Sequence, residues 1–248
     1  MELVITDAKE FKQAIDAIVN LVDEGTFEVT SDGLKLRSMD PSQIAMVDFS
    51  LPKNAFTELN TEGNASITLN LVDFTKVLSS ASSGEKLSIK LDEKENRLLL
   101  DFTGKSKRSF KLPLLESSAN TPREPKIEFD TKLKIKGGAL KGMLRDAGLL
   151  SSHVILQADD AEFLVEANGD SGDLRVETKK NSEIVVELDI KNKSRAMFPF
   201  EYLEDMTRSC TEDNVLTLEM KTDAPVKVSY EVGKAKLCYY LAPRVENA

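Results

Sequence analysis

An internal repeat is the feature that most constrains the fold. Apolar residues of the first half recur in the second half at a constant offset of 129 positions, as Phe11 recurs at Leu140 (140 minus 11). The offset maps helix-type spacing onto helix-type spacing and strand-type alternation onto strand-type alternation. The other pairs are Ile15–Leu144, Leu71–Phe200, Phe74–Leu203, Leu87–Leu216, Ile89–Leu218, Phe110–Tyr239 and Leu112–Leu241. This pattern predicts two copies of one domain.

Each half also divides into two smaller units. Helical spacing alternates with short β-branched or alternating runs that are bounded by Gly, Asp and Asn. The order in each half is strand, helix and three strands, followed by the same order again. We therefore predict an α+β fold of two duplicated domains, each built from two βαβββ units. The predicted helices are 8–21, 71–80, 138–149 and 200–209, and the clearest strand pairs are 27–38, 86–102 and 214–230.

A segment without periodicity separates the two halves. Residues 116–126, "ESSANTPREPK", are rich in Ser, Pro and charge, a composition typical of linkers. We predict an N-terminal domain at 1–116, an interdomain connector at 117–129 and a C-terminal domain at 130–248.

Composition excludes several kinds of site. One histidine and two separated cysteines argue against a zinc site of the usual N/S type, and we expect neither metal nor cofactor. The net charge of −9 argues against nucleic-acid binding unless the positive charges are segregated onto one surface. We find no signal peptide and no apolar run near the roughly 18 residues of a membrane span. The chain is expected to be intracellular, without a membrane partner.

No catalytic constellation is visible. Gly104-Lys105-Ser106 is half of a phosphate-binding loop, but the position five residues before Gly104 is Leu99 rather than glycine. His153 has no obvious acid partner, and Asp159-Asp160 is a weak metal signal. We expect a protein that is not an enzyme; a nucleotide-dependent enzyme using 104–106 is the alternative from another class.

A second, shorter connector at 40–44 joins two predicted strands and has apolar residues in and beside it. Met39, Ile44 and Met46 lie in or beside it, although connectors normally run over the surface, where apolar groups gain little. Either these residues belong to the core as parts of alternating strands, or they form half of a docking pocket. Methionine suits a surface that receives several partners, because it is flexible and polarisable.

Two motifs resemble the DNA sliding clamps of the proliferating cell nuclear antigen family, the archaeal type more closely than the eukaryotic. They are "LRSMDPSQIAMVDFSL" at 36–51, extended upstream by "LVDEGTFEVTSDGLKLRSMDPS", and "YYLAPRVE" at 239–246. The resemblance implies processivity-fold (DNA clamp) domains, a head-to-tail ring of three subunits with helices lining the hole, and no catalysis. The implied partners are duplex DNA, bound without sequence preference, and DNA polymerase, clamp loader, flap endonuclease and DNA ligase, bound through short peptide tails. The compartment would be cytoplasmic and nucleoid-associated in an archaeon, and nuclear in a eukaryote.

The resemblance also assigns residues. It implies a partner-peptide pocket of Met39, Asp40, Gln43, Ile44, Met46, Pro125, Phe129, Pro225, Tyr240, Leu241, Ala242 and Pro243. It places Lys12, Lys76, Lys111, Arg145 and Arg208 near DNA, and Lys9, Lys107 and Lys141 lie on the same predicted elements. Two pocket residues depart from the family pattern, Gln43 and Glu124. At four positions where the family often has basic residues, this chain has Gln13, Val19, Ser79 and Gly142.

Subunit pairing is expected between two edge strands, 108–114 of one subunit and 173–179 of the next. The interface residues would be Arg108, Phe110, Leu112, Leu174, Val176 and Thr178. A homotrimer is expected, and the alternative is one subunit of a heterotrimeric or checkpoint-type clamp. A polar substitution of Ile44 or Leu241 is expected to abolish peptide binding with little change in melting.

Overall fold

The computed structural model describes residues 1–116 and 121–244; the part of the predicted connector at 117–120 and the last four residues lie outside the described residues. The chain packs as two compact units. We call Met1–Pro41, Val47–Arg123 and Val232–Leu237 the N-terminal unit, and Ser42–Met46, Glu124–Glu231 and Cys238–Ala248 the C-terminal unit. Each unit thus includes one short segment from the other half of the sequence. Within the described ranges, no helix has the length and apolar character that a bilayer crossing needs.

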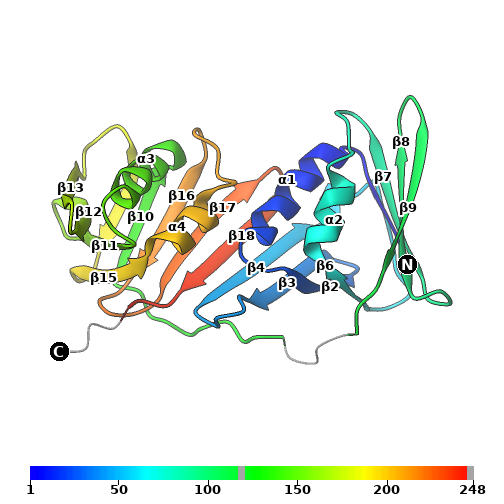
Figure 1. The fold of residues 1–248 in the computed structure, drawn as a ribbon, viewed down its shortest axis with the longest axis horizontal. Coiled ribbons are helices and arrows are strands. Elements are labelled where there is room, and N and C mark those ends of the chain that lie inside the picture. The colour runs from blue at the N-terminus through cyan, green and yellow to red at the C-terminus, as the bar shows by residue number, and fades with distance from the viewer. Residues whose placement is uncertain (117–120, 245–248) are drawn as a thin grey trace. The chain divides into compact units, whose positions relative to one another are not determined.

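In the N-terminal unit, two helices cover one face of antiparallel sheets (Figure 1). One sheet has the strand order β5-β1-β7-β8-β9, and β4-β3-β2-β6 are neighbours in a second sheet. The elements are β1 (Glu2–Ile5), α1 (Ala8–Val19), β2 (Glu24–Thr30), β3 (Gly33–Met39), β4 (Ala45–Pro52), the 3-10 helix η1 (Lys53–Ala55), β5 (Glu58–Asn60), β6 (Ala65–Asn70), α2 (Leu71–Leu78), β7 (Lys86–Asp92), β8 (Arg97–Thr103) and β9 (Lys107–Pro113).

The core of this unit lies between the helices and the sheets. The first helix begins at an N-cap, Asp7, whose carboxylate accepts from the backbone N–H groups of Lys9 (2.9 Å) and Glu10 (3.1 Å). Its buried stripe brings Phe11 edge-to-face against Phe74 of α2, with ring centroids 6.2 Å apart. The apolar spacing therefore fixes one helix face inward and leaves the opposite face to solvent.

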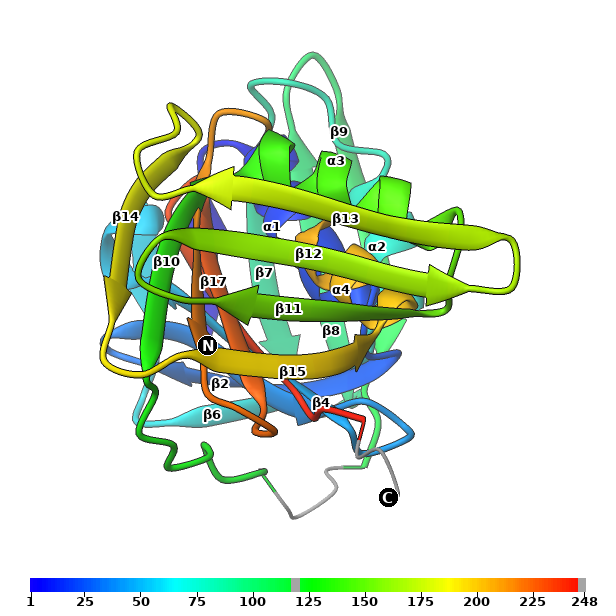
Figure 2. The same ribbon diagram turned by 90° about the vertical axis from the view of Figure 1, so that its left-hand side faces the viewer.

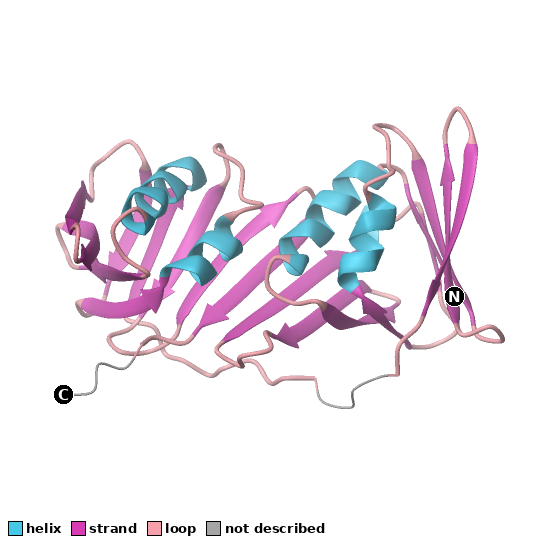
Figure 3. Cartoon of the chain, in the orientation of Figure 1, coloured by secondary structure: helices cyan, strands magenta, loops and turns pink. Residues whose placement is uncertain are grey.

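The C-terminal unit repeats this plan. One sheet has the order β13-β12-β11-β15, and the other β14-β10-β16-β17-β18. Figure 2 looks onto the first sheet, with α3 and α4 behind it; Figure 3 shows the same division into helices and strands by colour. The elements are β10 (Thr131–Lys136), α3 (Gly137–Gly148), β11 (His153–Ala158), β12 (Glu162–Gly169), β13 (Gly172–Lys179), β14 (Val185–Ile190), β15 (Ser194–Pro199), α4 (Phe200–Thr207), β16 (Val215–Met220), β17 (Val226–Val232) and β18 (Ala235–Leu241).

The predicted duplication is confirmed. Adding 129 to the bounds of α1 gives 137–148, the bounds of α3, and adding it to those of α2 gives 200–207, the bounds of α4. The four predicted helices and the three strand pairs are all present. Each half has one further strand beyond its two βαβββ units, β5 or β14. These strands lie at sheet edges, pair with β1 and β10, and bury few side chains, so their apolar pattern is weak.

Candidate functional site

Three segments far apart in the sequence meet on the C-terminal unit. Two hydrogen bonds join the connector at 40–44, the end of the interdomain linker at 124–129, and the last strand with the residues that follow it, 240–243. The Ala242 N–H donates to the Ile44 carbonyl at 2.8 Å, and the Tyr240 hydroxyl donates to Glu124 Oε1 at 2.6 Å. The residues predicted for the peptide pocket that belong to this unit and are apolar and half-buried are named the docking surface, after the role expected of them: Ile44, Pro125, Phe129, Pro225, Ala242 and Pro243.

Other predicted pocket residues are part of the core. Met46 is 2% exposed, Tyr240 4% and Leu241 0%. The core interpretation therefore holds for Met46, whereas Met39 and Ile44 are half-buried and Gln43 is exposed. The full burial of Leu241 contradicts the expectation that a polar substitution there leaves melting unchanged, because a buried leucine typically contributes about 2–5 kcal/mol relative to a small side chain. Asp40, in the N-terminal unit, is also buried.

Glu124, the departure noted in the linker, has a structural role. Burial, and then the hydrogen bond with Glu124, raises the pKa of Tyr240 well above its usual value, so the phenol stays a donor. The ammonium of Lys227 lies 5.7 Å from the centroid of the same ring. These contacts hold the end of the linker against the last strand, and sequence reasoning did not predict them.

The connector bends at Gln43. This residue has a φ of 60°, in the left-handed region that costs a residue with a Cβ roughly 1–2 kcal/mol. Strained backbone of this kind clusters at functional sites. The bend exposes Gln43 beside the half-buried Ile44.

The helix faces carry the predicted basic residues, mostly paired with acids of the same helix. Lys12 pairs with Asp16, and Lys76 with Asp73 at 2.9 Å. Arg208, directly after α4, pairs with Asp205 at 2.5 Å, and burial raises the pKa of this acid. The positive field over these helices is therefore modest. The exposed Lys9 and Arg145 have no carboxylate partner among the described residues.

Three predicted DNA-facing lysines are placed differently. The Lys141 ammonium donates to the backbone carbonyls of Arg208 (3.1 Å) and Cys210 (2.9 Å), which ties α3 to the end of α4. Lys107 pairs with Asp101 at 3.3 Å, and Lys111 with Glu95 at 3.4 Å. Side chains alternate across a strand, and the intervening Arg108 is directed toward α2, where it donates to the Ser80 carbonyl at 2.7 Å. Lys107 and Lys111 therefore lie on the sheet face opposite the helices, apart from the helix-borne bases.

Both predicted pairing strands are edge strands. In their sheets, β9 and β13 each have a neighbour on one side only, β8 and β12 respectively. Phe110, Leu112, Leu174 and Val176 are half-buried along these edges, whereas Thr178 is buried. Arg108 is already engaged within the chain, by Glu85, the Ser80 carbonyl and the ring of Phe102 at 5.3 Å. Two open edges with partly covered apolar side chains can extend a sheet into another chain.

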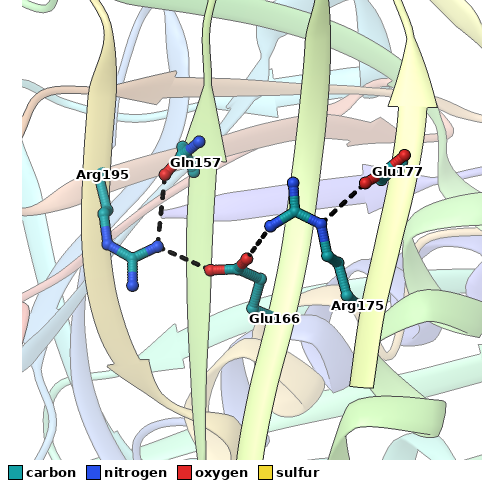
Figure 4. A network of polar contacts seen from close by, with 5 residues as sticks. All are labelled: Gln157, Glu166, Arg175, Glu177 and Arg195. Atoms are coloured by element: carbon teal, nitrogen blue, oxygen red, sulfur yellow. Dashed lines mark hydrogen bonds and ion pairs between the residues drawn. The ribbon is translucent and has the colours of Figure 1, made fainter. Parts of the chain in front are cut away.

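A charged network crosses the face of the β13-β12-β11-β15 sheet that is opposite its helices (Figure 4). Glu166 accepts from Arg195 at 2.7 Å on one side and from Arg175 on the other. Arg175 also donates to Glu177 at 2.8 Å, and Arg195 to Gln157 at 3.3 Å. Arg195 first, and then Arg175, lower the pKa of Glu166. The network fixes side chains of the edge strand β13 and links them to β12, β11 and β15.

The half phosphate-binding loop and Cys210 have structural positions. Gly104-Lys105-Ser106 is the hairpin turn between β8 and β9, with no following helix to present N–H groups to a phosphate. Burial raises the pKa of the Cys210 thiol to about 11, which keeps it protonated and unreactive. Over the described residues, no group of three or more His, Cys, Asp or Glu side chains is placed to hold a metal ion.

Known proteins match the whole chain. Residues 1–119 match the family model for the N-terminal domain of proliferating cell nuclear antigen, and 123–245 match that for its C-terminal domain. A DNA polymerase sliding clamp of Methanococcus vannielii is 33% identical over 97% of this chain and 98% of its own length. Among solved structures, the proliferating cell nuclear antigen (PCNA) of Thermococcus kodakaraensis superposes with a TM-score of 0.92 at 28% identity, covering 98% of this chain and 99% of that one. The A. fulgidus PCNA, solved with the C-terminal region of FEN-1 bound, superposes with a TM-score of 0.89 at 27% identity, covering 100% of this chain and 99% of that one.

The duplicated fold and these full-length matches define a DNA sliding clamp. The chain belongs to the proliferating cell nuclear antigen family.

Proposed function

We propose that this chain forms a ring of three identical subunits around duplex DNA and tethers replication and repair proteins to it. The observation that carries the proposal is the pair of open sheet edges, β9 and β13, within a fold of the sliding-clamp family. An interface between two different edges is heterologous, so it must close into a ring to avoid forming a filament. In such a ring, β9 of each chain would pair with β13 of the next.

The number of helices supports three subunits. The described chain has four α-helices, so three subunits would line the hole with twelve. Helices pack about 8–10 Å apart, which gives a ring of axes roughly 35 Å across, and removing a helix radius of about 5 Å on each side leaves about 25 Å. That width admits a duplex loosely, whereas two subunits would leave only about 15 Å.

DNA would be touched by the helix faces. Lys12, Lys76, Arg145 and Arg208 are the bases that we assign to this contact, with the exposed Lys9 beside them in α1. Lys107, Lys111 and Lys141 do not belong to this set, because of their placement. Contacts limited to phosphates would be independent of base sequence and weakened by salt. Lysine and arginine side chains that pair with neighbouring carboxylates would bind the DNA phosphates weakly. Weak binding suits a ring that must slide along DNA.

The docking surface would receive the short peptide tails of client proteins. The A. fulgidus relative was solved with a C-terminal region of FEN-1, and we extend that mode of binding to this chain. Polymerase, clamp loader, flap endonuclease and ligase are the clients we propose. The protein would supply no catalysis of its own and would be associated with the DNA of the cell. We also keep the division into domains 1–116 and 130–248, joined by 117–129, as a proposal.

Replacing Ile44 by aspartate should weaken the binding of a synthetic client-tail peptide, one with an aliphatic and two aromatic anchors, by at least about thirtyfold. Ile44 is half-buried on the docking surface, so a charge there meets the apolar anchors without disturbing the core. Titration calorimetry measures the affinity, and melting is expected to change little.

The matched control is Val186→Asp, a branched apolar residue that is 56% exposed on β14, away from the docking surface. It should leave peptide affinity unchanged. Equal binding by the wild type and Ile44→Asp would remove the docking surface from the proposal. Leu241 is not a suitable test position, because its burial confounds binding with folding.

A further inference from the structure

Two hollows lie side by side next to the docking surface, on the C-terminal unit. They have volumes of about 480 Å³ and 330 Å³ and share three lining residues, Ile155, Met197 and Arg244. Pro243 of the docking surface lines the larger hollow, so the two regions are continuous. The larger hollow adds Arg195, Thr222 and Asp223, and the smaller adds Ser152, His153, Asn168 and Asp170.

The charge at the boundary of the hollows belongs to Arg244. Its backbone N–H donates to the Met197 carbonyl at 2.8 Å, which fixes the chain along the edge strand β15. One guanidinium nitrogen lies 3.3 Å from Nδ1 and 3.4 Å from Nε2 of His153. An atom at these distances from both ring nitrogens would clash with the carbon between them if it lay in the ring plane. The guanidinium therefore packs against the face of the imidazole.

Over the described residues, Arg244 differs from its neighbour Arg195 in having no carboxylate partner. Arg195 is held by Glu166 at 2.7 Å and by Gln157 (Figure 4). Among the described residues, no carboxylate forms an ion pair with Arg244 or with His153. Asp170 and Asp223 line the hollows without pairing with Arg244. The guanidinium thus keeps donor capacity that is directed to no acidic group.

The surroundings of His153 favour the neutral imidazole. Its Nδ1 lies 3.0 Å from the Ser152 hydroxyl. Burial, and then the charge of Arg244, lower its pKa. The groups that face it are Arg244 and the Ser151 and Ser152 hydroxyls, with Asp170 in the same lining. A carboxylate that bound Arg244 would reverse part of this shift, because it favours the protonated imidazole.

We propose that Arg244 receives an acidic side chain that flanks the apolar anchors of a docked client peptide. The inference rests on the proposed docking function and adds a preference within it. Arg244 pairs with no carboxylate of the described residues and lies at the edge of an apolar surface, beside the Ser152, Asn168 and Thr222 side chains, so it is complementary to a carboxylate. Asp170 and Asp223 would repel the carboxylate of the peptide. The preference for an acidic peptide therefore depends on the guanidinium of Arg244.

The first test compares two client-tail peptides that are identical except for glutamate or glutamine just outside the anchors. Each flanking position is scanned in turn. The wild type should bind the best-placed glutamate peptide about three- to fivefold more tightly, the range of a partly exposed ion pair. Arg244→Gln should lose this preference while it still binds the glutamine peptide. Lys180→Gln, the same charge change at an exposed residue after β13, should retain it.

Three outcomes would count against the proposal. A wild type that binds both peptides equally at every position, with binding still abolished by Ile44→Asp, would overturn the inference and leave the docking function standing. A preference that survives Arg244→Gln would assign the effect to another base. If neither peptide binds, the docking function and the inference both fail.

The second test uses His153, the only histidine of the chain, as a unique NMR reporter. The pKa of His153 should rise when the glutamate peptide binds and stay unchanged with the glutamine peptide. In the free protein, Arg244→Gln should raise it, because removal of a cation favours the imidazolium. A Glu246→Gln variant whose His153 pKa lies below that of the wild type would show that the chain's own tail fills the site, and would overturn the proposal.

Discussion

Proline at a position of β13 whose N–H group points toward the open edge of the sheet should convert the trimer into folded monomers of 27.5 kDa. Proline removes one ladder N–H and is tolerated within a sheet only on an open edge, so it blocks pairing with the next subunit. Along β13, successive N–H groups point alternately toward β12 and toward the open edge of the sheet. We therefore expect one of the pair Val176→Pro and Glu177→Pro to give a stable monomer and the other to disturb pairing with β12. Sedimentation measures the mass, and circular dichroism reports whether the chain is folded.

The same experiment on β9 uses Ser109→Pro and Phe110→Pro. The matched control is Val186→Pro, because β14 is also an edge strand but is not assigned to the interface. Its ring should remain intact. Folded β9 and β13 variants that keep the mass of the wild-type trimer would show that these edges do not join subunits.

Changing Lys12, Lys76, Arg145 and Arg208 together to alanine should abolish stimulation of a polymerase on primed DNA, while the ring stays intact. Each subunit loses four positive charges from its helices and their ends, and phosphate affinity depends on such charges. Primer extension measures the stimulation, and gel filtration checks assembly.

The control for this variant carries the same change in charge elsewhere. Lys94, Lys180, Lys191 and Lys221 are exposed residues in loops and turns between strands, away from the helix faces. Their replacement by alanine should preserve stimulation. Normal stimulation by the helix variant would mean that these bases are only solvated, whereas an equal loss in both variants would indicate an effect of net charge.

Much of the fold could be predicted from local pattern. The buried stripe of α1 follows from spacings of three and four residues, and its counterpart α3 follows from the repeat. The edge strands β5 and β14 escaped prediction because strands that bury few side chains have no strong period. Position at a sheet edge depends on strand order, which local spacing does not specify.

The candidate site was harder to predict, because it depends on side-chain direction. The family resemblance placed Lys111 near DNA, and Lys107 was added as a basic residue of the same strand, yet alternation along β9 directs both side chains to the sheet face opposite the helices. Leu241 belonged to the expected pocket, but its side chain is fully buried. The contacts of Tyr240 with Glu124 and of Arg244 with His153 join residues 116 and 91 positions apart, and no local pattern predicts such pairs.

The central claim is that this chain alone closes into a ring of three. Light scattering coupled to gel filtration of the purified chain, without any paralogue, tests it most directly. The account predicts a single species of about 82.5 kDa at micromolar concentration, three times the 27.5 kDa of one chain. A species of 27.5 kDa under the same conditions would contradict it.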